Sequence, residues 1–222
     1  TYDTLVVGNN ALDNAIAAQK WATEDNLADL GQPVDRTRWF MTPQTINAYY
    51  NPSFNEIVFP AAILQPPFFN VSADPAVNYG AIGGVIGHEM GHGFDDQGAK
   101  YNGEGVLKNW WTEEDLAAFR QLGDALAKQY SSYCPLDDGE TCVNGRLTLG
   151  ENIGDLGGLS LAYRAYKMSL NGKEAPVIDG LTGDQRFFLA WAQVWRSAQR
   201  EGSYRQRLRT DPHSPEEYRV NG

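Results

Sequence analysis

Apolar positions recur every three or four residues along most of the chain, the pattern of helices that bury one face. Segment 10–30 shows this pattern and stops at Gly31 and Pro33, two residues that end helices. Segment 77–94 is predicted to be helical despite its glycines, which would permit close packing against a neighbouring element. Further helices are predicted over 112–130, over 149–170 with an interruption at Gly157 and Gly158, from Thr182 onward, and from Ser214 onward.

Capping residues mark the starts of three of these helices. Thr112, followed by Asp115, forms a near capping box, and Thr182 is predicted to cap the helix after it. Ser214 is predicted to cap the last helix, with Pro215 in its first turn. The helix after Thr182 carries an apolar stripe composed of Phe187, Phe188, Trp191 and Trp195.

One part of the chain has the pattern of a β-hairpin instead. Segments 45–50 and 56–59 are rich in strand-forming residues and flank Asn51-Pro52-Ser53, and Pro60 ends the second segment. Five or six helices and one hairpin predict a helix-dominated α+β fold. Because no repeat and no flexible linker divides the sequence, residues 1–222 are predicted to form a single domain.

Composition excludes several classes of protein. Of the 222 residues, 42% are apolar and 21% are charged, which is typical of globular proteins and not of disordered ones. The net charge of −10 argues against binding to nucleic acid or to an anionic membrane surface, since both require a basic face. No apolar run approaches the roughly 18 residues of a membrane-spanning helix. Because the chain begins at Thr1 and stops without a polar tail, we expect a fragment of a longer protein.

Cys134 and Cys142 flank a loop that is rich in turn residues. Their spacing allows a small disulfide, which would stabilise the fold by about 2.5 kcal/mol at most and would suit an oxidising compartment. Two free thiols are the alternative. Zinc binding by this pair is disfavoured, because the chain has neither a CxxC spacing nor a second cysteine pair.

The strongest chemical signal is the stretch His88-Glu89-Met90-Gly91-His92. On a helix, residues four apart lie on one face, so the imidazoles of His88 and His92 can reach one zinc ion. Glu89 lies beside that face and can hydrogen-bond a water bound to the metal. The alternative is a pair of packed or solvated histidines without a metal.

A catalytic zinc needs a third protein ligand and an open position. A metzincin would have Gly and His where this chain has Asp95 and Gly98, so that class is excluded. Glu151 and Asp155 are four residues apart on a second predicted helix, so both carboxylates face the same way. One can bind zinc while the other accepts a hydrogen bond from a zinc-bound histidine. A solvated acidic helix face would show the same spacing.

Together these residues resemble the neprilysin and endothelin-converting-enzyme-like zinc endopeptidases. The similarity runs over nearly the whole chain. Its motifs are Asn47-Ala-Tyr-Tyr50, Asn55-Glu-Ile-Val-Phe-Pro60, Leu64-Gln-Pro-Pro-Phe-Phe69, the stretch 88–98, Leu149-Gly-Glu-Asn-Ile-Gly-Asp155 and Asp211-Pro-His-Ser-Pro215.

The resemblance implies a thermolysin-like catalytic domain of the zincin, gluzincin type, with a small β-hairpin edge. It implies one zinc ion per chain, bound by His88, His92 and Glu151. Glu89 would be the general base that activates the zinc-bound water, and Asp155 the partner of a zinc-bound histidine. Hydrolysis of peptide bonds by a zinc metalloendopeptidase is the expected activity.

The resemblance also assigns substrate contacts. His213 is similar to the residue that donates to the developing oxyanion, and Arg219 to one that holds a substrate carbonyl. Asn47 and Ala48 match an edge strand that pairs with the substrate backbone, which agrees with the predicted hairpin. An apolar pocket for the residue after the scissile bond would be formed by Ile63, Phe68, Val85 and Trp195, although ordinary core packing would place them equally well.

Members of this family usually have an upstream helical domain that covers the active site, and we expect that missing domain as a partner, alongside peptide substrates. An extracytoplasmic location is expected from the resemblance and the cysteine pair. Two alternatives to an active enzyme stay open. One is an inactive piece that still binds zinc, which an assay of peptide turnover would identify. The other is a metal-free binding module, which metal analysis would identify.

Overall fold

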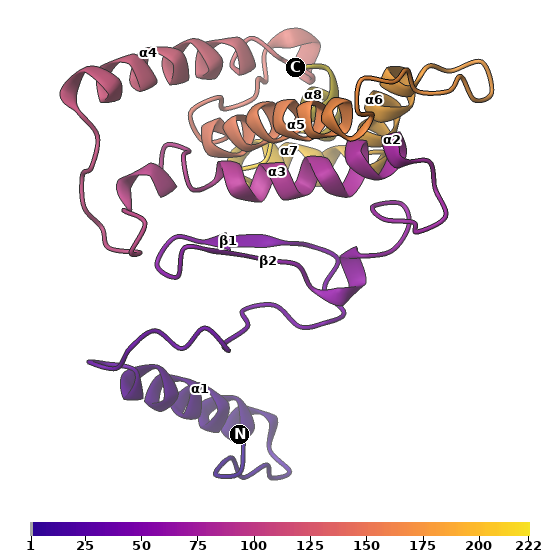
Figure 1. The fold of residues 1–222 in the computed structure, drawn as a ribbon. Helices are drawn as coiled ribbons and strands as arrows, with labels where there is room; N and C mark the ends of the chain where they lie inside the picture. The colour runs from indigo at the N-terminus through magenta and orange to yellow at the C-terminus, as the bar shows by residue number, and fades with distance from the viewer. Residues whose placement is uncertain (1) are drawn as a thin grey trace. The chain divides into compact units, whose positions relative to one another are not determined.

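The structure is a computed structural model that describes residues 2–222. The chain separates into two compact units, Thr1–Phe40 and Met41–Gly222. The first contains α1 (Ala11–Ala28), drawn in indigo in Figure 1. The side chain of Asn10 accepts hydrogen bonds from the backbone N–H groups of Leu12 and Asp13, which caps this helix. The predicted helix at 10–30 is therefore confirmed.

The second unit contains the hairpin and seven α-helices among the described residues. The strands are β1 (Tyr49–Asn51) and β2 (Glu56–Val58). The helices are α2 (Pro75–Asn78), α3 (Gly84–Gly91), α4 (Glu113–Tyr130), α5 (Leu149–Ser169), α6 (Gly183–Val194), α7 (Glu201–Thr210) and α8 (Glu216–Asn221). The helix-dominated α+β prediction is confirmed, whereas the assignment of residues 1–222 to one catalytic domain stays a prediction.

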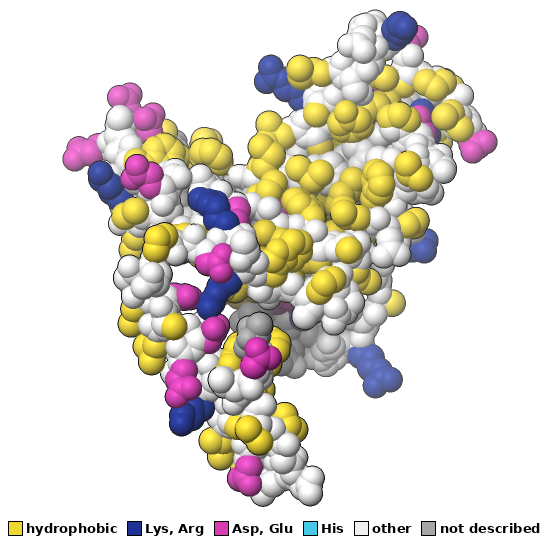
Figure 2. Space-filling view, turned by 60° about the horizontal axis from the view of Figure 1, so that its bottom comes forward, with side chains coloured by type: hydrophobic (Ala, Val, Ile, Leu, Met, Phe, Trp, Pro, Cys, Tyr) yellow, Lys and Arg dark blue, Asp and Glu magenta, His cyan; other side chains and the backbone are white. Residues whose placement is uncertain are grey.

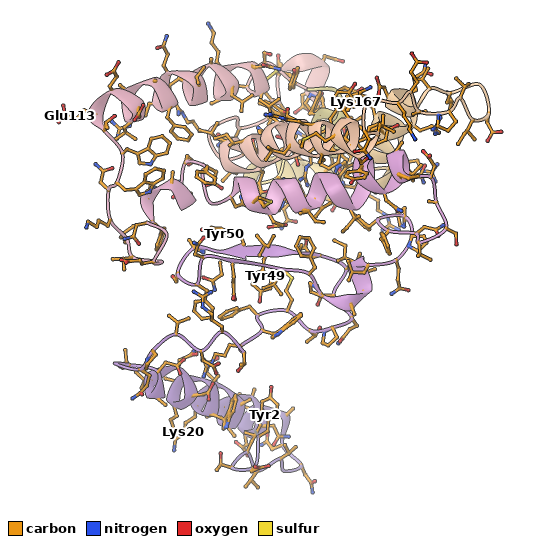
Figure 3. All side chains as sticks on the ribbon, viewed as in Figure 1. Tyr2, Lys20, Tyr49, Tyr50, Glu113 and Lys167 are labelled. Atoms are coloured by element: carbon orange, nitrogen blue, oxygen red, sulfur yellow. A yellow bond between two sulfur atoms is a disulfide. The ribbon has the colours of Figure 1, made fainter. Side chains whose placement is uncertain are left out.

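The hairpin is shorter than its sequence pattern indicated. β1 pairs antiparallel with β2, with Tyr49 opposite Val58. Residues 45–48 were predicted to belong to the first strand, but they precede it, because a turn brings the N–H of Thr45 to the carbonyl of Thr42. Figure 3 shows Tyr49 and Tyr50 on opposite sides of β1. Within the described residues the sheet has only these two strands, so the other edge of β1 has no strand beside it.

The predicted helix at 77–94 is present in three successive parts. α2 leads into a π-helical segment, Tyr79–Gly83, which continues into α3. The segment runs beside α5, as Figure 1 shows. The wider π turn lies just before the helix that carries the two histidines, a position where such turns are frequently functional.

α3 and α5 meet at backbone distance. A Cβ atom added at Gly87 would lie 2.4 Å from the carbonyl oxygen of Gly158, and one added at Gly91 would lie 3.2 Å from the Cα of Gly154. The predicted interruption of α5 at Gly157 and Gly158 is wrong, because α5 is continuous from Leu149 to Ser169. Gly158 serves this close contact and does not break the helix.

α6 contributes two large side chains to the core beside this helix pair. Phe187 and Trp191 are fully buried, and Thr182 and Gln185 form a complete capping box at the start of the helix. The predicted apolar stripe is only partly correct, since Phe188 is 49% exposed and Trp195 lies just after the helix. Figure 2 shows that many other apolar side chains also remain on the surface.

The C-terminal region differs most from its prediction. α7 was not predicted, because its sequence is strongly polar and only Leu208 is buried. Ser214 was predicted to cap the last helix, but Pro215 occupies that position, and the Ser214 hydroxyl hydrogen-bonds Asn152 instead.

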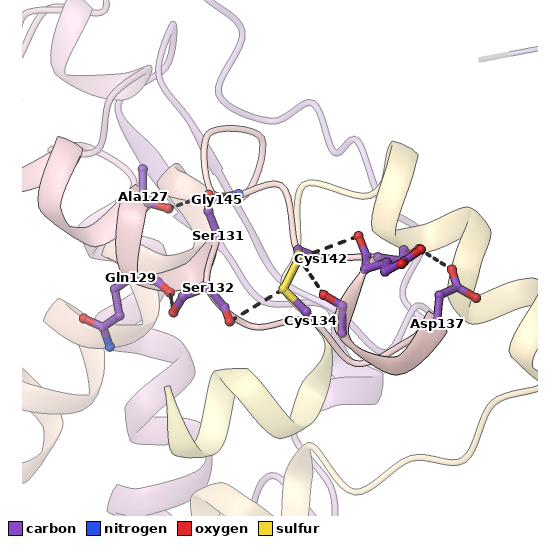
Figure 4. The surroundings of a disulfide bond; sticks show 11 residues. Ala127, Gln129, Ser131, Ser132, Cys134, Asp137, Cys142 and Gly145 are labelled. Carbon is purple, nitrogen blue, oxygen red and sulfur yellow. Dashed lines mark hydrogen bonds between the residues drawn. A yellow bond between two sulfur atoms is a disulfide. The ribbon is translucent and has the colours of Figure 1, made fainter.

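Cys134 and Cys142 form a disulfide, which confirms that prediction. Figure 4 shows the bond beside Ser131 and Ser132, which follow α4. Within the loop that the disulfide closes, both carboxylate oxygens of Asp137 accept hydrogen bonds from Arg205.

Across residues 2–222, no helix combines the length and the apolar character that crossing a bilayer requires.

Candidate metal centre and peptide cleft

Two imidazoles lie one helical turn apart at the C-terminal end of α3. The rings of His88 and His92 are 4.6 Å apart between centroids. Each ring uses Nδ1 for a carboxylate: His88 contacts Asp155 at 2.8 Å, and His92 contacts Asp95 at 2.7 Å. Because these contacts fix the proton on Nδ1, both Nε2 atoms are left with a free lone pair to bind a metal.

Glu151, in the first turn of α5, supplies the third candidate ligand. Its Oε2 atom lies 3.1 Å from Nε2 of His88 and 3.7 Å from Nε2 of His92. Ligand atoms bound at about 2.0–2.1 Å to one tetrahedral zinc are separated by about 3.3–3.4 Å. The observed separations lie on either side of this value. The same Oε2 is buried without a hydrogen-bond partner, as expected for an atom that binds a metal. These three side chains therefore fit zinc.

The charges around the centre favour protons on the histidines when no metal is bound. Burial disfavours the imidazolium of His88, but the hydrogen bond to Asp155 and the nearby carboxylate of Glu151 outweigh burial and raise its pKa to about 9. Burial opposes protonation of His92 as well, yet its bond to Asp95 raises the pKa. Metal binding must displace these protons, so metal affinity falls in acid.

Glu89 is 5% exposed and, together with the three candidate ligands, lines one cavity. Burial is the main influence on this carboxyl group, and it raises the pKa despite the two nearby imidazoles. A carboxylate with a raised pKa accepts a proton more readily than a solvated one, which is what a general base requires.

Asp155 is held from both sides. Besides His88, it binds Nε and Nη2 of Arg219 at 2.6 and 2.7 Å. Burial favours the neutral acid, but Arg219 and His88 together hold the pKa of Asp155 below its ordinary value. The guanidinium of Arg219 in turn stacks 3.7 Å from the ring of Trp195. α8 is thereby fastened to the two helices that carry the ligands.

His213 reaches the centre from the loop between α7 and α8. Its Nδ1 contacts Asp211 at 2.7 Å, and its Nε2 lies 3.2 Å from Oε2 of Glu151. Its side chain is 39% exposed, so it can meet a bound molecule.

A cavity of about 320 Å³ joins these groups. All the predicted ligand and substrate-contacting residues line it. They are Asn47, Ala48, Ile63, Phe68, Val85, His88, Glu89, His92, Glu151, Trp195, His213 and Arg219. Ile63 and Val85 are almost fully buried and also belong to the core. They are therefore both core residues and part of the cavity wall, the two interpretations that the sequence left open. A larger cavity, of about 490 Å³, lies elsewhere, against Trp111 and Phe119, and contains none of these residues.

Sequence reasoning missed Asp95 and Tyr50. Asp95 lies three residues after His92, and this spacing on one helix end was an available signal. Tyr50 lines the cavity from β1; it ends the motif Asn47-Ala-Tyr-Tyr50, but the sequence analysis assigned it no role.

Comparisons with known proteins show which family this chain resembles. The family model of peptidase family M13 matches residues 47–222. Neprilysin-3 of Drosophila melanogaster is 42% identical over 221 residues, which are 98% of this chain and 28% of that protein. Endothelin-converting enzyme 1 of Homo sapiens is 46% identical over 224 residues, which are 99% of this chain and 29% of that protein.

A crystal structure of the zinc metalloprotease ZMP1 of Mycobacterium tuberculosis, in complex with an inhibitor, is also similar. It is 60% identical with a TM-score of 0.87, over 90% of this chain and 31% of that chain. This chain therefore spans less than a third of the length of each of these three relatives. Since the family model covers most of the sequence and the solved relative has the same fold, the chain belongs to peptidase family M13.

Proposed function

We propose that this chain is the catalytic part of a zinc-dependent endopeptidase. The observation that carries the proposal is the set of three ligand atoms, from His88, His92 and Glu151, near tetrahedral spacing in the wall of an open cavity. The names of the relatives, which include a zinc metalloprotease, support the same metal. One zinc ion per chain is the expected cofactor.

The chain's own residues would perform the proton transfers. Zinc, when bound, supplies Lewis acidity to the site. Glu89 takes a proton from the attacking water and delivers it to the leaving amine, a role worth about 10²–10⁴ in rate. His213 donates a hydrogen bond to the oxyanion that develops on the substrate. Asp155 holds His88 in the orientation that presents Nε2 to the metal.

The shape of the cavity supports a hydrophobic residue after the scissile bond. Ile63, Phe68 and Val85 provide an apolar wall, and Trp195 closes it beside Arg219. Asn47 and Ala48 precede the open edge of β1, where an extended peptide can be added as one more strand. Arg219 would hold a substrate carbonyl while it remains bonded to Asp155.

The test is Glu89→Gln in the protein at its natural length, with Glu104→Gln in an exposed loop as the matched control. Hydrolysis of a quenched peptide should fall about 10²–10⁴-fold, while bound zinc stays near one per chain, because no ligand is removed. If Glu89→Gln keeps more than a tenth of wild-type turnover, Glu89 is not the base. Zinc binding without turnover in the wild type would identify an inactive zinc protein, and absence of zinc a metal-free binding module.

Two further expectations accompany the proposal. The disulfide between Cys134 and Cys142 supports an extracytoplasmic location, because such bonds persist in oxidising compartments. An upstream helical domain of the same protein, which the resemblance implies, would cover the cleft and limit the size of the substrates.

A further inference from the structure

A buried polar contact joins α5 to the loop that carries His213. The hydroxyl of Ser214 donates to Oδ1 of Asn152 at 2.8 Å, and both residues have no exposed surface. The amide of Asn152 donates at 3.0 Å to the hydroxyl of Thr148, the residue just before α5. Polar side chains buried to this extent are costly unless they are hydrogen-bonded. The two segments are therefore held in one relative position.

The contact lies one residue away from two members of the proposed active site. Asn152 follows Glu151 on α5, and Ser214 follows His213. Nε2 of His213 lies 3.2 Å from Oε2 of Glu151. A shift of the loop relative to α5 would change this separation directly.

A second contact on the same loop has a different effect. Asp211 accepts from the backbone N–H of His213 at 2.9 Å and contacts its Nδ1 at 2.7 Å, and Arg207 binds Asp211 at 3.0 Å. These bonds lie within α7 and the loop, so they set the rotation of the imidazole. They do not fix the distance between the loop and α5, which the contact of Ser214 with Asn152 spans.

We propose that Ser214 and Asn152 are positioning residues that hold His213 at the place where the oxyanion develops. The inference rests on the proposed function, because it assumes that His213 donates to that oxyanion. A donor of this kind matters mainly in the transition state, so displacing it lowers kcat and leaves substrate binding nearly unchanged.

The first experiment is Ser214→Ala in the protein at its natural length. Losing an oxyanion donor altogether costs about 10²–10³-fold in kcat, so a displaced donor should cost about 10-fold or more. KM and bound zinc should stay close to wild type. Ser131→Ala is the matched control: its hydroxyl also donates one hydrogen bond, in this case to the backbone carbonyl of Ala127, and it lies outside the cavity. The control should keep the wild-type kcat.

The second experiment repeats Ser214→Ala in a His213→Ala background. If Ser214 acts through His213, the extra loss of kcat should disappear there, whereas the fall in Tm caused by Ser214→Ala should persist. Should Ser214→Ala not fold, Ser214→Cys keeps a weak donor and should give an intermediate kcat in the same comparison.

Three results would overturn the inference. The first is a kcat of Ser214→Ala or Ser214→Cys within twofold of wild type. The second is an equal loss of kcat with and without His213, which would indicate general damage to the fold. The third is an unchanged kcat for His213→Ala alone. That result removes the premise about His213, while loss of turnover in Glu89→Gln would still uphold hydrolysis by this site.

Discussion

Asp95→Asn tests how far zinc affinity depends on the orientation of one histidine. Oδ2 of Asp95 contacts Nδ1 of His92 at 2.7 Å, and Oδ1 accepts from the backbone N–H groups of Gln97 and Gly98 at 2.8 and 2.7 Å. An asparagine has nearly the same size, but one of its two ends is an NH₂ donor. In one orientation the NH₂ faces Nδ1 of His92 and drives the ring proton onto Nε2, the atom needed for zinc. In the other orientation the NH₂ group faces the backbone N–H groups of Gln97 and Gly98, so donors face donors and their hydrogen bonds are lost.

The expected loss follows from the burial of this contact. Outer-shell partners of metal-bound histidines are typically worth about 10–100-fold in metal affinity, or about 1.4–2.7 kcal/mol. Because Asp95 is 5% exposed, solvent does not replace the lost contact, and we expect the upper half of this range. Asp155→Asn should cost at least as much, because Asp155 is similarly buried and is also the partner of Arg219.

The assay is competition for zinc against a chromogenic chelator at pH 7, using the protein at its natural length. Asp96→Asn is the control, because Asp96 is the adjacent carboxylate and contacts Gln97 instead of an imidazole. The reasoning is refuted if Asp95→Asn binds zinc within threefold of wild type, or if Asp96→Asn weakens binding equally.

Three further predictions concern the helices, the disulfide loop and the third ligand. Gly158→Ala places Cβ 2.2 Å from the backbone nitrogen of His88 and should lower the free energy of unfolding by about 1–3 kcal/mol or more. Gly157→Ala meets nothing within 4 Å and should raise it by up to about 1 kcal/mol. Urea unfolding measures both variants, and equal losses of stability would contradict the close packing of Gly158. Asp137→Asn should lower Tm at pH 7, because hydrogen bonds from Arg205 hold the pKa of Asp137 below its ordinary 3.8. This stabilisation is present above that pH and is lost as the carboxylate protonates, so the difference in Tm should narrow below pH 4, and a constant difference would argue against the assignment. Glu151→Ala should lose zinc on dialysis, and an unchanged metal content would place the third ligand elsewhere.

Local sequence spacing was enough to predict the centre of the site. His88 and His92 are four residues apart on one helix, and Glu151 and Asp155 repeat that spacing on another. The period of a helix alone places each pair on a single face. That the two faces meet is a matter of tertiary packing, and here the resemblance to a known family supplied what spacing could not.

Elements defined by long-range contacts escaped prediction. α7 is strongly polar and has one buried residue, so its sequence offers too few apolar positions to predict a helix. Ser214 has the local signature of a helix cap, but a partner 62 positions away, Asn152, uses its hydroxyl. Gly158 has the local signature of a helix breaker, but its contact with the backbone of α3 explains why a glycine is present there.

Helices α3 and α5 pack against each other through regularly spaced glycines. Gly87 faces Gly158 and Gly91 faces Gly154, so the contact positions run antiparallel at four-residue intervals. On α5 the series of small residues continues with Gly150. A slide of one turn, about 5.4 Å, would set Gly87 against Gly154 and Gly91 against Gly150, again small against small.

The glycine contacts between α3 and α5 therefore do not by themselves distinguish these two positions, whereas the polar groups do. Only the observed setting brings Asp155 to Nδ1 of His88 and Oε2 of Glu151 between the two Nε2 atoms. The residues of the candidate metal centre thus also distinguish the observed position of the two helices from the shifted one. Losing the carboxylates of Glu151 and Asp155 would therefore remove the contacts that distinguish the observed position of α3 against α5, in addition to removing a candidate metal ligand and the partner of His88.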